Sequence, residues 1–326
     1  MSTAFVLTTN LLAWNHKEAS TRDAFQKARA AVDRLADCLA IEEAFAVLVA
    51  NYASFEQAVA AANIGNMVDR GMLEADFHNR RREVERHLVN LLATGRMFTE
   101  HLTKRTAWTF GEGSAATAAV KAALDEQRDQ LFGFRATERL RDAVLHRQLP
   151  ITSWSSGGRW TGTEMADGSV SKRAPTARLE HSVTFVFSPR LLARDRKVPP
   201  EVISGLLDRT DEAGHVDWIP LVREYVEGLS MVLGSVRVLW GNAEATASAY
   251  LAELTGSYLA ALPEGVTPPA AVFAVEQDDE GRWLSKVLLN RGYEALLADL
   301  RRKQGPMVNL HRRTLVEPPR SSARSR

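Results

Sequence analysis

The sequence predicts a mostly helical chain, in which an N-terminal antiparallel helical bundle is followed by a C-terminal α+β domain. Before Pro150, apolar side chains recur at three- and four-residue steps in long segments separated by short polar connections. After Pro150, which stops a helix, the chain becomes rich in Ser, Thr and Gly and contains β-branched and aromatic runs. We therefore expect a bundle over 1–150, an α+β domain of unassigned role over 151–308, and a basic, disordered tail over 309–326.

The first 150 residues are expected to be almost wholly helical. Apolar periodicity predicts helix from Thr21 to Ala40 and again from Ile41 to about Met67, and a turn follows near Asp69. A longer helix is predicted from Glu74 to about Arg105.

A glycine-rich loop at 110–114 then leads to Ser114, a residue type that caps helix N-termini. Residues 115–147 are predicted to form one long helix or two shorter ones. Short connections of this kind join antiparallel neighbours in a bundle.

The second half begins with strand and hairpin signals. Residues 151–154 and 181–187 are predicted strands, because they are dense in β-branched and aromatic side chains. Hairpin-type turn residues lie at 155–158 and 166–168. Ser188 and Pro189 then open a short helix, because Pro is allowed in the first helical turn.

Helical periodicity returns after Pro200 and alternates with two more strands. Helices are predicted over 217–240 and 243–262. A proline-rich linker over 263–269 precedes predicted strands at 271–275 and 283–289, and the last helix is predicted over 293–303. The five tryptophans of this half, Trp154, Trp160, Trp218, Trp240 and Trp283, are most simply packing residues.

Composition excludes several classes of protein. The chain has 326 residues, 45% hydrophobic and 25% charged, which is the profile of a globular protein. Its single cysteine, Cys38, excludes an intrachain disulfide framework and argues against a cysteine-based zinc site. No run of about 18 uninterrupted apolar residues is present, and the N-terminus lacks the basic start of a secretory signal. We expect a cytoplasmic protein that does not associate with membranes.

The near-neutral net charge of +1 conceals a basic C-terminus. Residues 301–326 contain eight Lys or Arg and one acid, Glu317, so the remainder of the chain is mildly acidic. A basic tail can follow nucleic-acid phosphates, or it can simply be a solvated terminus. Net charge alone therefore neither requires nor excludes a nucleic-acid partner.

The common catalytic motifs are absent from the sequence. It contains no Gly-x-Gly-x-x-Gly, P-loop, His-Glu-x-x-His or Gly-x-Ser-x-Gly pattern. Asp208, Asp211 and His215 lie close together, and we expect a polar turn there rather than a metal site. Cys38 lies on an Ala- and Leu-rich helix face, where a small buried residue is expected.

One segment carries specific chemistry, the helix end that contains Arg141, Asp142 and His146. Histidine titrates near neutrality and can act as a general acid or base. Arginine stays charged and binds phosphate through two N–H groups. With some local unwinding the two side chains can converge on one phosphate, where His146 moves the proton of an attacking 2′-hydroxyl and Arg141 stabilises the phosphoryl charge. Asp142 would orient either residue, and Arg139 and Arg147 supply positive charge for RNA.

This segment resembles the signature of the HEPN superfamily, an Arg followed after four to six residues by a His, often with Asn, Asp or His directly after the Arg. The resemblance covers the motif and the helical character of roughly residues 20–150, and none is identified for 151–326. Many HEPN domains are ribonucleases of toxin–antitoxin, abortive-infection and CRISPR-type defence systems. They generally dimerise so that two motifs face one cleft. The resemblance therefore implies a metal-independent endoribonuclease that forms a homodimer, acts on RNA, needs no cofactor or metal, and can pair with an antitoxin or regulatory protein.

The same spacing occurs elsewhere in the chain. Three consecutive arginines, 80–82, precede His87, Arg96 precedes His101, and Arg209 precedes His215. Only Arg141 has Asp next to it and also lies on the last helix before the fold changes. The alternative is that Arg141 and Asp142 are ordinary helix residues and that His146 is favoured at a helix C-terminus by the dipole. The chain would then be a non-catalytic helical interaction or scaffold protein, or a nucleic-acid-binding partner.

Overall fold

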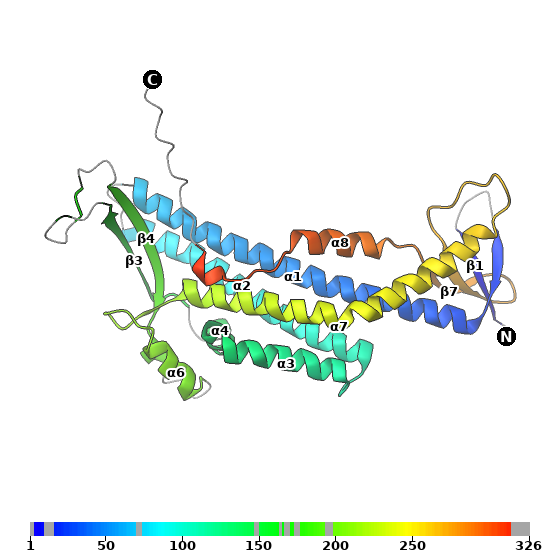
Figure 1. Cartoon of the computed structure of the whole chain (residues 1–326), viewed down its shortest axis with the longest axis horizontal. Coiled ribbons are helices and arrows are strands. Elements are labelled where there is room, and N and C mark those ends of the chain that lie inside the picture. The colour runs from blue at the N-terminus through cyan, green and yellow to red at the C-terminus, as the bar shows by residue number, and fades with distance from the viewer. Residues whose placement is uncertain are drawn as a thin grey trace, which may run out of the picture. The chain divides into compact units, whose positions relative to one another are not determined.

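The computed structural model describes residues 3–9, 16–69, 74–146, 150–162, 165, 170–172, 177–192 and 198–313, except for the side chains of Ala143, Leu145, His146 and Leu191. Within these ranges the chain is mostly helical and carries two small antiparallel sheets (Figure 1). It divides into two compact units, and each unit takes residues from both sides of Pro150. Unit 1 is Met1–Ala53, Thr94–Leu124 and Val232–Pro306, and unit 2 is Ser54–Ala93, Asp125–Met231 and Met307–Arg326.

The helices expected before Pro150 are present. They are α1 (Arg22–Val68), α2 (Glu74–Phe110), α3 (Ala115–Gln130) and α4 (Phe132–His146). The two segments expected on either side of residue 40 form one continuous α1, and residues 115–146 form two helices. The expected cap is confirmed, because Ser114 Oγ accepts a hydrogen bond from the Thr117 N–H at 3.2 Å.

The expectation of an almost wholly helical N-terminal half is wrong at its start. Two strands, β1 (Ala4–Thr8) and β2 (Lys17–Ser20), precede α1. They join β6 (Phe273–Gln277) and β7 (Trp283–Leu288) in an antiparallel sheet of order β2-β1-β6-β7. Val6 pairs with Val275, a partner far along the chain that local periodicity does not reveal.

In unit 1 this sheet packs against parts of α1 and of α7 (Trp218–Ala260). Helix α7 is one continuous helix where two were expected over 217–262. The buried cluster contains Leu7 from β1, Phe25 and Leu35 from α1, and Leu251 and Tyr258 from α7. Elsewhere in unit 1, Phe45 packs on Phe98, and Trp240 packs edge-on against Phe110. The expected packing role of Trp240 is thus confirmed.

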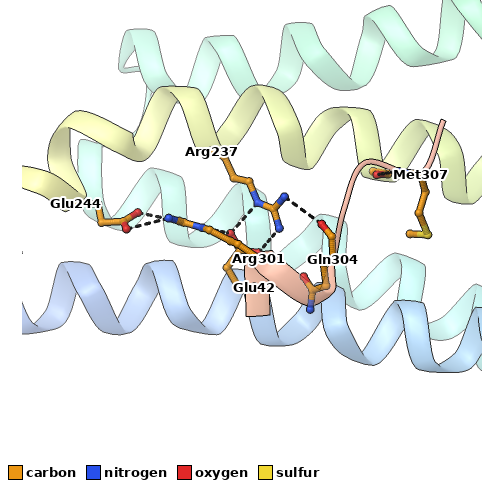
Figure 2. A network of polar contacts seen from close by, with 7 residues as sticks. Glu42, Arg237, Glu244, Arg301, Gln304 and Met307 are labelled. Atoms are coloured by element: carbon orange, nitrogen blue, oxygen red, sulfur yellow. Dashed lines mark hydrogen bonds and ion pairs between the residues drawn. The ribbon is translucent and has the colours of Figure 1, made fainter. Parts of the chain in front are cut away.

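A buried ion-pair network ties α8 (Tyr293–Lys303) to α1 and α7 (Figures 1 and 2). Glu42, only 2% exposed, accepts two hydrogen bonds from Arg237 at 2.9 and 2.7 Å and one from Arg301 at 2.8 Å. Arg301 also donates two bonds to Glu244, at 2.9 and 2.8 Å. Burial by itself would lower the pKa of Arg301, but the bonds to Glu244 and Glu42 outweigh it and raise that pKa.

Unit 2 contains the second sheet, β3 (Ser153–Thr161), β4 (Arg178–Phe187) and β5 (Val216–Asp217), in that order. Short helices α5 (Pro189–Leu192) and α6 (Pro200–Leu207) follow β4. Trp154 stacks on Phe185 with ring centroids 5.7 Å apart. Trp218 packs on Phe187 and donates its indole N–H to the Pro150 carbonyl at 2.8 Å, so both tryptophans have the expected packing role.

The prediction of a disordered tail from residue 309 is wrong for its first residues. A short 3₁₀ helix, Leu310–Arg312, packs in unit 2 with Leu310 buried. The nearly buried carboxylate of Glu227 accepts hydrogen bonds from the Asn309 and Leu310 backbone N–H groups at 2.8 and 3.1 Å. The Glu227 carboxylate thus holds the start of this 3₁₀ helix in place. The composition of the tail does not reveal this contact. Residues 314–326 of the expected tail lie outside the described residues.

By length and composition α1 passes as a membrane-spanning helix, since an 18-residue window reaches a mean hydropathy of 1.4. The same composition is found in core helices. Within the protein 39% of that window is buried, and Phe45, Leu48 and Phe55 are among the buried residues of α1.

Candidate functional site

Helix α4 is held on α7 by apolar and polar contacts within unit 2. Phe134 is fully buried, its ring centroid lies 5.5 Å from that of Tyr225, and it packs so closely on Gly228 that a Cβ there would lie 2.3 Å from the ring. At the start of the helix, the Gly133 N–H donates to Glu224 Oε2 at 2.6 Å. These contacts determine which face of α4 is turned toward α7.

Arg141 lies on that same face. It follows Phe134 by seven residues, two helical turns, and its side chain is only 15% exposed. Its Nε donates to Asp142 Oδ1 at 3.3 Å. Burial raises the pKa of the Tyr225 hydroxyl, and the nearby positive charge of Arg141 partly opposes that shift. The positive charge of Arg141 therefore lies close enough to Tyr225 to affect its hydroxyl, and the hydrogen bond from its Nε goes to the exposed Asp142.

Of the other motif residues, the structure describes some completely and others only in part or not at all. Arg139 and Asp142 are exposed on α4. The backbone at His146 is helical, its side chain is outside the described part of the structure, and Arg147 lies wholly outside it. Because α4 stays helical from Arg141 to His146, five residues place their Cα–Cβ directions about 140° apart around the axis. The local unwinding that would let both side chains of one chain converge is not seen in this helix.

The other arginines that precede a histidine at a similar spacing lie in different environments. Arg96 pairs with Glu100 at 2.7 Å. Arg209 lies over the Phe132 ring, 3.9 Å from its centroid. Asp211 Oδ1 accepts hydrogen bonds from the Ala213 and His215 backbone N–H groups, so this stretch is the expected polar turn.

Arg80 and His87, by contrast, line one hollow. They are seven residues apart on α2 and so lie on one face of it. The hollow has a volume of about 410 Å³ and lies within unit 2, between α2 and the end of α1. It is lined by Ser54, Gln57, Ala58, Ala61, Ala62, Arg80, Glu83 and His87. In the sequence this pair is less favoured than Arg141 and His146, because Arg81, not a favoured polar residue, follows Arg80, although the two-turn spacing is a visible signal.

The remaining features of the described residues concern metal ligands and the single thiol. Across the described ranges, no group of three or more His, Cys, Asp and Glu is arranged to hold a metal ion. Cys38 is buried as expected, and desolvation raises its thiol pKa to about 12, which keeps it protonated and unreactive.

Comparisons with known proteins do not assign the chain. No protein-family model, curated protein or solved structure matches it.

Proposed function

We propose that this chain is a cytoplasmic, metal-independent endoribonuclease that serves as a toxin or antiviral-defence effector. The observation that carries the proposal is the restrained side chain of Arg141, since Asp142 accepts from its Nε and most of its surface is buried. A guanidinium fixed before substrate arrives loses little freedom when it binds a phosphate, as a pre-organised catalytic group requires.

The chemistry follows from the residue types. His146 accepts the proton of an RNA 2′-hydroxyl as that oxygen attacks the adjacent phosphorus. Arg141 stabilises the charge that develops on the non-bridging oxygens. The bond to the 5′-oxygen breaks, that oxygen takes up a proton, and the products carry a 2′,3′-cyclic phosphate and a 5′-hydroxyl.

The helical geometry of α4 favours a site shared between two chains. The 140° separation places Arg141 and His146 of one chain on different sides of the helix, so one phosphate is reached more readily by Arg141 from one copy and His146 from another. A two-fold homodimer produces two such sites. This agrees with the dimer that the HEPN resemblance implies.

Cleavage assays with purified protein test the proposal. Wild type in excess EDTA should cleave single-stranded RNA, and His146→Gln should lose at least about 100-fold of the rate, the usual contribution of a general acid or base. Asp142→Asn should lose less and serves as a control in the same motif. Cleavage that is equal in wild type and His146→Gln, or absent from wild type, contradicts the proposal.

A second candidate is a non-catalytic helical protein that binds a nucleic acid, an antitoxin or another regulatory protein. The observation that favours it is that the Arg141 side chain is only 15% exposed and lies on the face of α4 that packs on α7, a placement that structural packing alone explains. It expects wild type to cleave no RNA, and Arg141→Gln to lower the melting temperature while His146→Gln does not. The same set of variants therefore separates the two functions.

A further inference from the structure

Another hollow of unit 2 lies between helix α2 and the start of strand β3. Its volume is about 490 Å³, which falls within the range of small-molecule sites. Its α2 wall consists of residues at three- and four-residue steps, and therefore of one helix face: Glu74, Phe77, His78 and Arg81. Its other wall is formed by Thr152, Ser153 and Trp154. The Ile151 N–H donates to the buried Glu85 of α2 at 3.2 Å, which holds the two walls together.

Arg81 offers unpaired donors to this hollow. The neighbouring Arg80 and Arg86 are paired with Asp69 and Glu83, whereas Arg81 forms no hydrogen bond or ion pair with any described residue. Its Nε is buried without an acceptor, but its two terminal nitrogens keep accessible surface. Accessible terminal N–H groups of a guanidinium can donate two parallel hydrogen bonds to a phosphate.

Phe77 and Trp154 give the same hollow an aromatic surface. Their ring centroids lie 5.1 Å apart, and Trp154 also stacks on Phe185, which holds its orientation. Both Phe77 and Trp154 are only half-buried, so part of each ring is uncovered where it lines the hollow. Uncovered aromatic surface beside a cation suits a planar ring such as a nucleobase.

The remaining polar groups indicate which end of the hollow a phosphate would occupy. Glu74 lies 3.5 Å from His78 and seven residues before Arg81, so it lies about 10 Å from Arg81 along the helix axis. A carboxylate repels a phosphate but accepts hydrogen bonds from ribose hydroxyls or from a base amino group. The hydroxyl of Ser153 has no hydrogen-bond partner among the described residues and supplies a further neutral contact. A phosphate is therefore favoured at the Arg81 end.

We propose that this hollow binds a nucleotide, with its phosphate on Arg81 and its base against Phe77 and Trp154. A simple anion would use only the arginine, and an apolar ligand would use only the rings, so a ligand that carries both groups fits best. The nucleotide is either free or one unit of a single-stranded nucleic acid. The inference does not rest on the proposed ribonuclease activity, because it uses none of the motif residues and predicts binding rather than cleavage.

Calorimetric titration of the full chain with AMP tests the inference. Arg81→Gln should weaken AMP binding at least about tenfold, because the charged hydrogen bonds to the phosphate are lost. The matched control Arg82→Gln, an exposed arginine on the same helix outside the hollow, should change AMP binding less than about twofold. Adenosine lacks the phosphate and ribose 5-phosphate lacks the base, so each should bind at least about tenfold more weakly than AMP.

A second variant covers the case in which Arg81→Gln does not fold. Phe77→Leu keeps an apolar side chain but removes the ring, so it should weaken AMP binding at least about fivefold and leave ribose 5-phosphate binding unchanged. A role of Phe77 in packing alone would weaken both equally.

A ten-nucleotide oligodeoxyadenylate, which has no 2′-hydroxyl to attack a phosphate, identifies the source of the nucleotide. A unit of a strand predicts oligonucleotide binding that Arg81→Gln weakens, and a free nucleotide predicts that the strand does not bind. Wild type that binds no AMP, either variant binding AMP as wild type does, or adenosine or ribose 5-phosphate binding as tightly as AMP would each overturn the inference.

Discussion

Replacing Arg237 with Met should strongly destabilise unit 1, because it leaves the buried carboxylate of Glu42 short of donors (Figure 2). Among the described residues, two of the three hydrogen bonds from arginines to Glu42 come from Arg237, and Glu42 is 2% exposed, so water cannot replace them. Removing one partner of a buried ion pair costs about 3–5 kcal/mol. Arg301 remains bonded to Glu42, so we expect the lower end, about 3 kcal/mol.

Urea unfolding followed by tryptophan fluorescence measures this loss, with Trp240 in the same unit as a reporter. Arg302→Met is the matched control, because Arg302 is 73% exposed and pairs with Asp299 of its own helix; it should cost under about 1 kcal/mol. The double variant Arg237→Met/Glu42→Leu should recover part of the loss, since no unpaired buried carboxylate remains. A loss below about 1 kcal/mol for Arg237→Met, or a double variant no more stable than Arg237→Met alone, would refute the reasoning.

Three further predictions concern single residues. Burial raises the pKa of Asp217 from 3.8 to about 6, so its ionisation opposes folding as pH rises through that interval, by roughly 2–3 kcal/mol above pH 6. Asp217→Asn, which keeps an acceptor for the Ile219 N–H, should therefore raise the melting temperature at pH 8 and leave it unchanged at pH 3; an equal shift at both would contradict this. Cys38 should react with a thiol reagent only in denaturant, as timed absorbance measurements would show. Gly228→Ala should cost about 1–3 kcal/mol in urea unfolding, because its methyl group collides with Phe134, whereas an unchanged midpoint would exclude that close contact.

Local signals in the sequence were sufficient for much of the fold. The cap at Ser114 and the last helix, Tyr293–Lys303, follow from side-chain chemistry and periodicity within a few residues of each. Pairing at long range was not accessible in this way. Strand β1 has five residues and joins β6, so its identity depends on a partner at the other end of the sequence.

For the candidate site, too, local sequence features were predictable and contacts between distant segments were not. The sequence identified Arg141 from spacing and from the neighbouring Asp142, but burial against Tyr225 depends on which face of α4 meets α7. The spacing of Arg80 and His87 is visible in the sequence, but the hollow that they line is not. Its second wall comes from α1, and a single-helix motif search does not see which residues of the facing helix are small.

The central claim is that Arg141 and His146 of different copies form one metal-independent site, and mixing inactive variants tests it most directly. In the proposed two-fold dimer, a heterodimer of Arg141→Gln and His146→Gln has one intact site and one site that carries both substitutions. Each variant alone should be inactive on RNA in EDTA. After co-refolding, the equimolar mixture should regain about a quarter of wild-type cleavage, since random pairing makes about half the dimers mixed and each has one working site of two. A mixture as inactive as its components, with wild type active, would contradict the shared site.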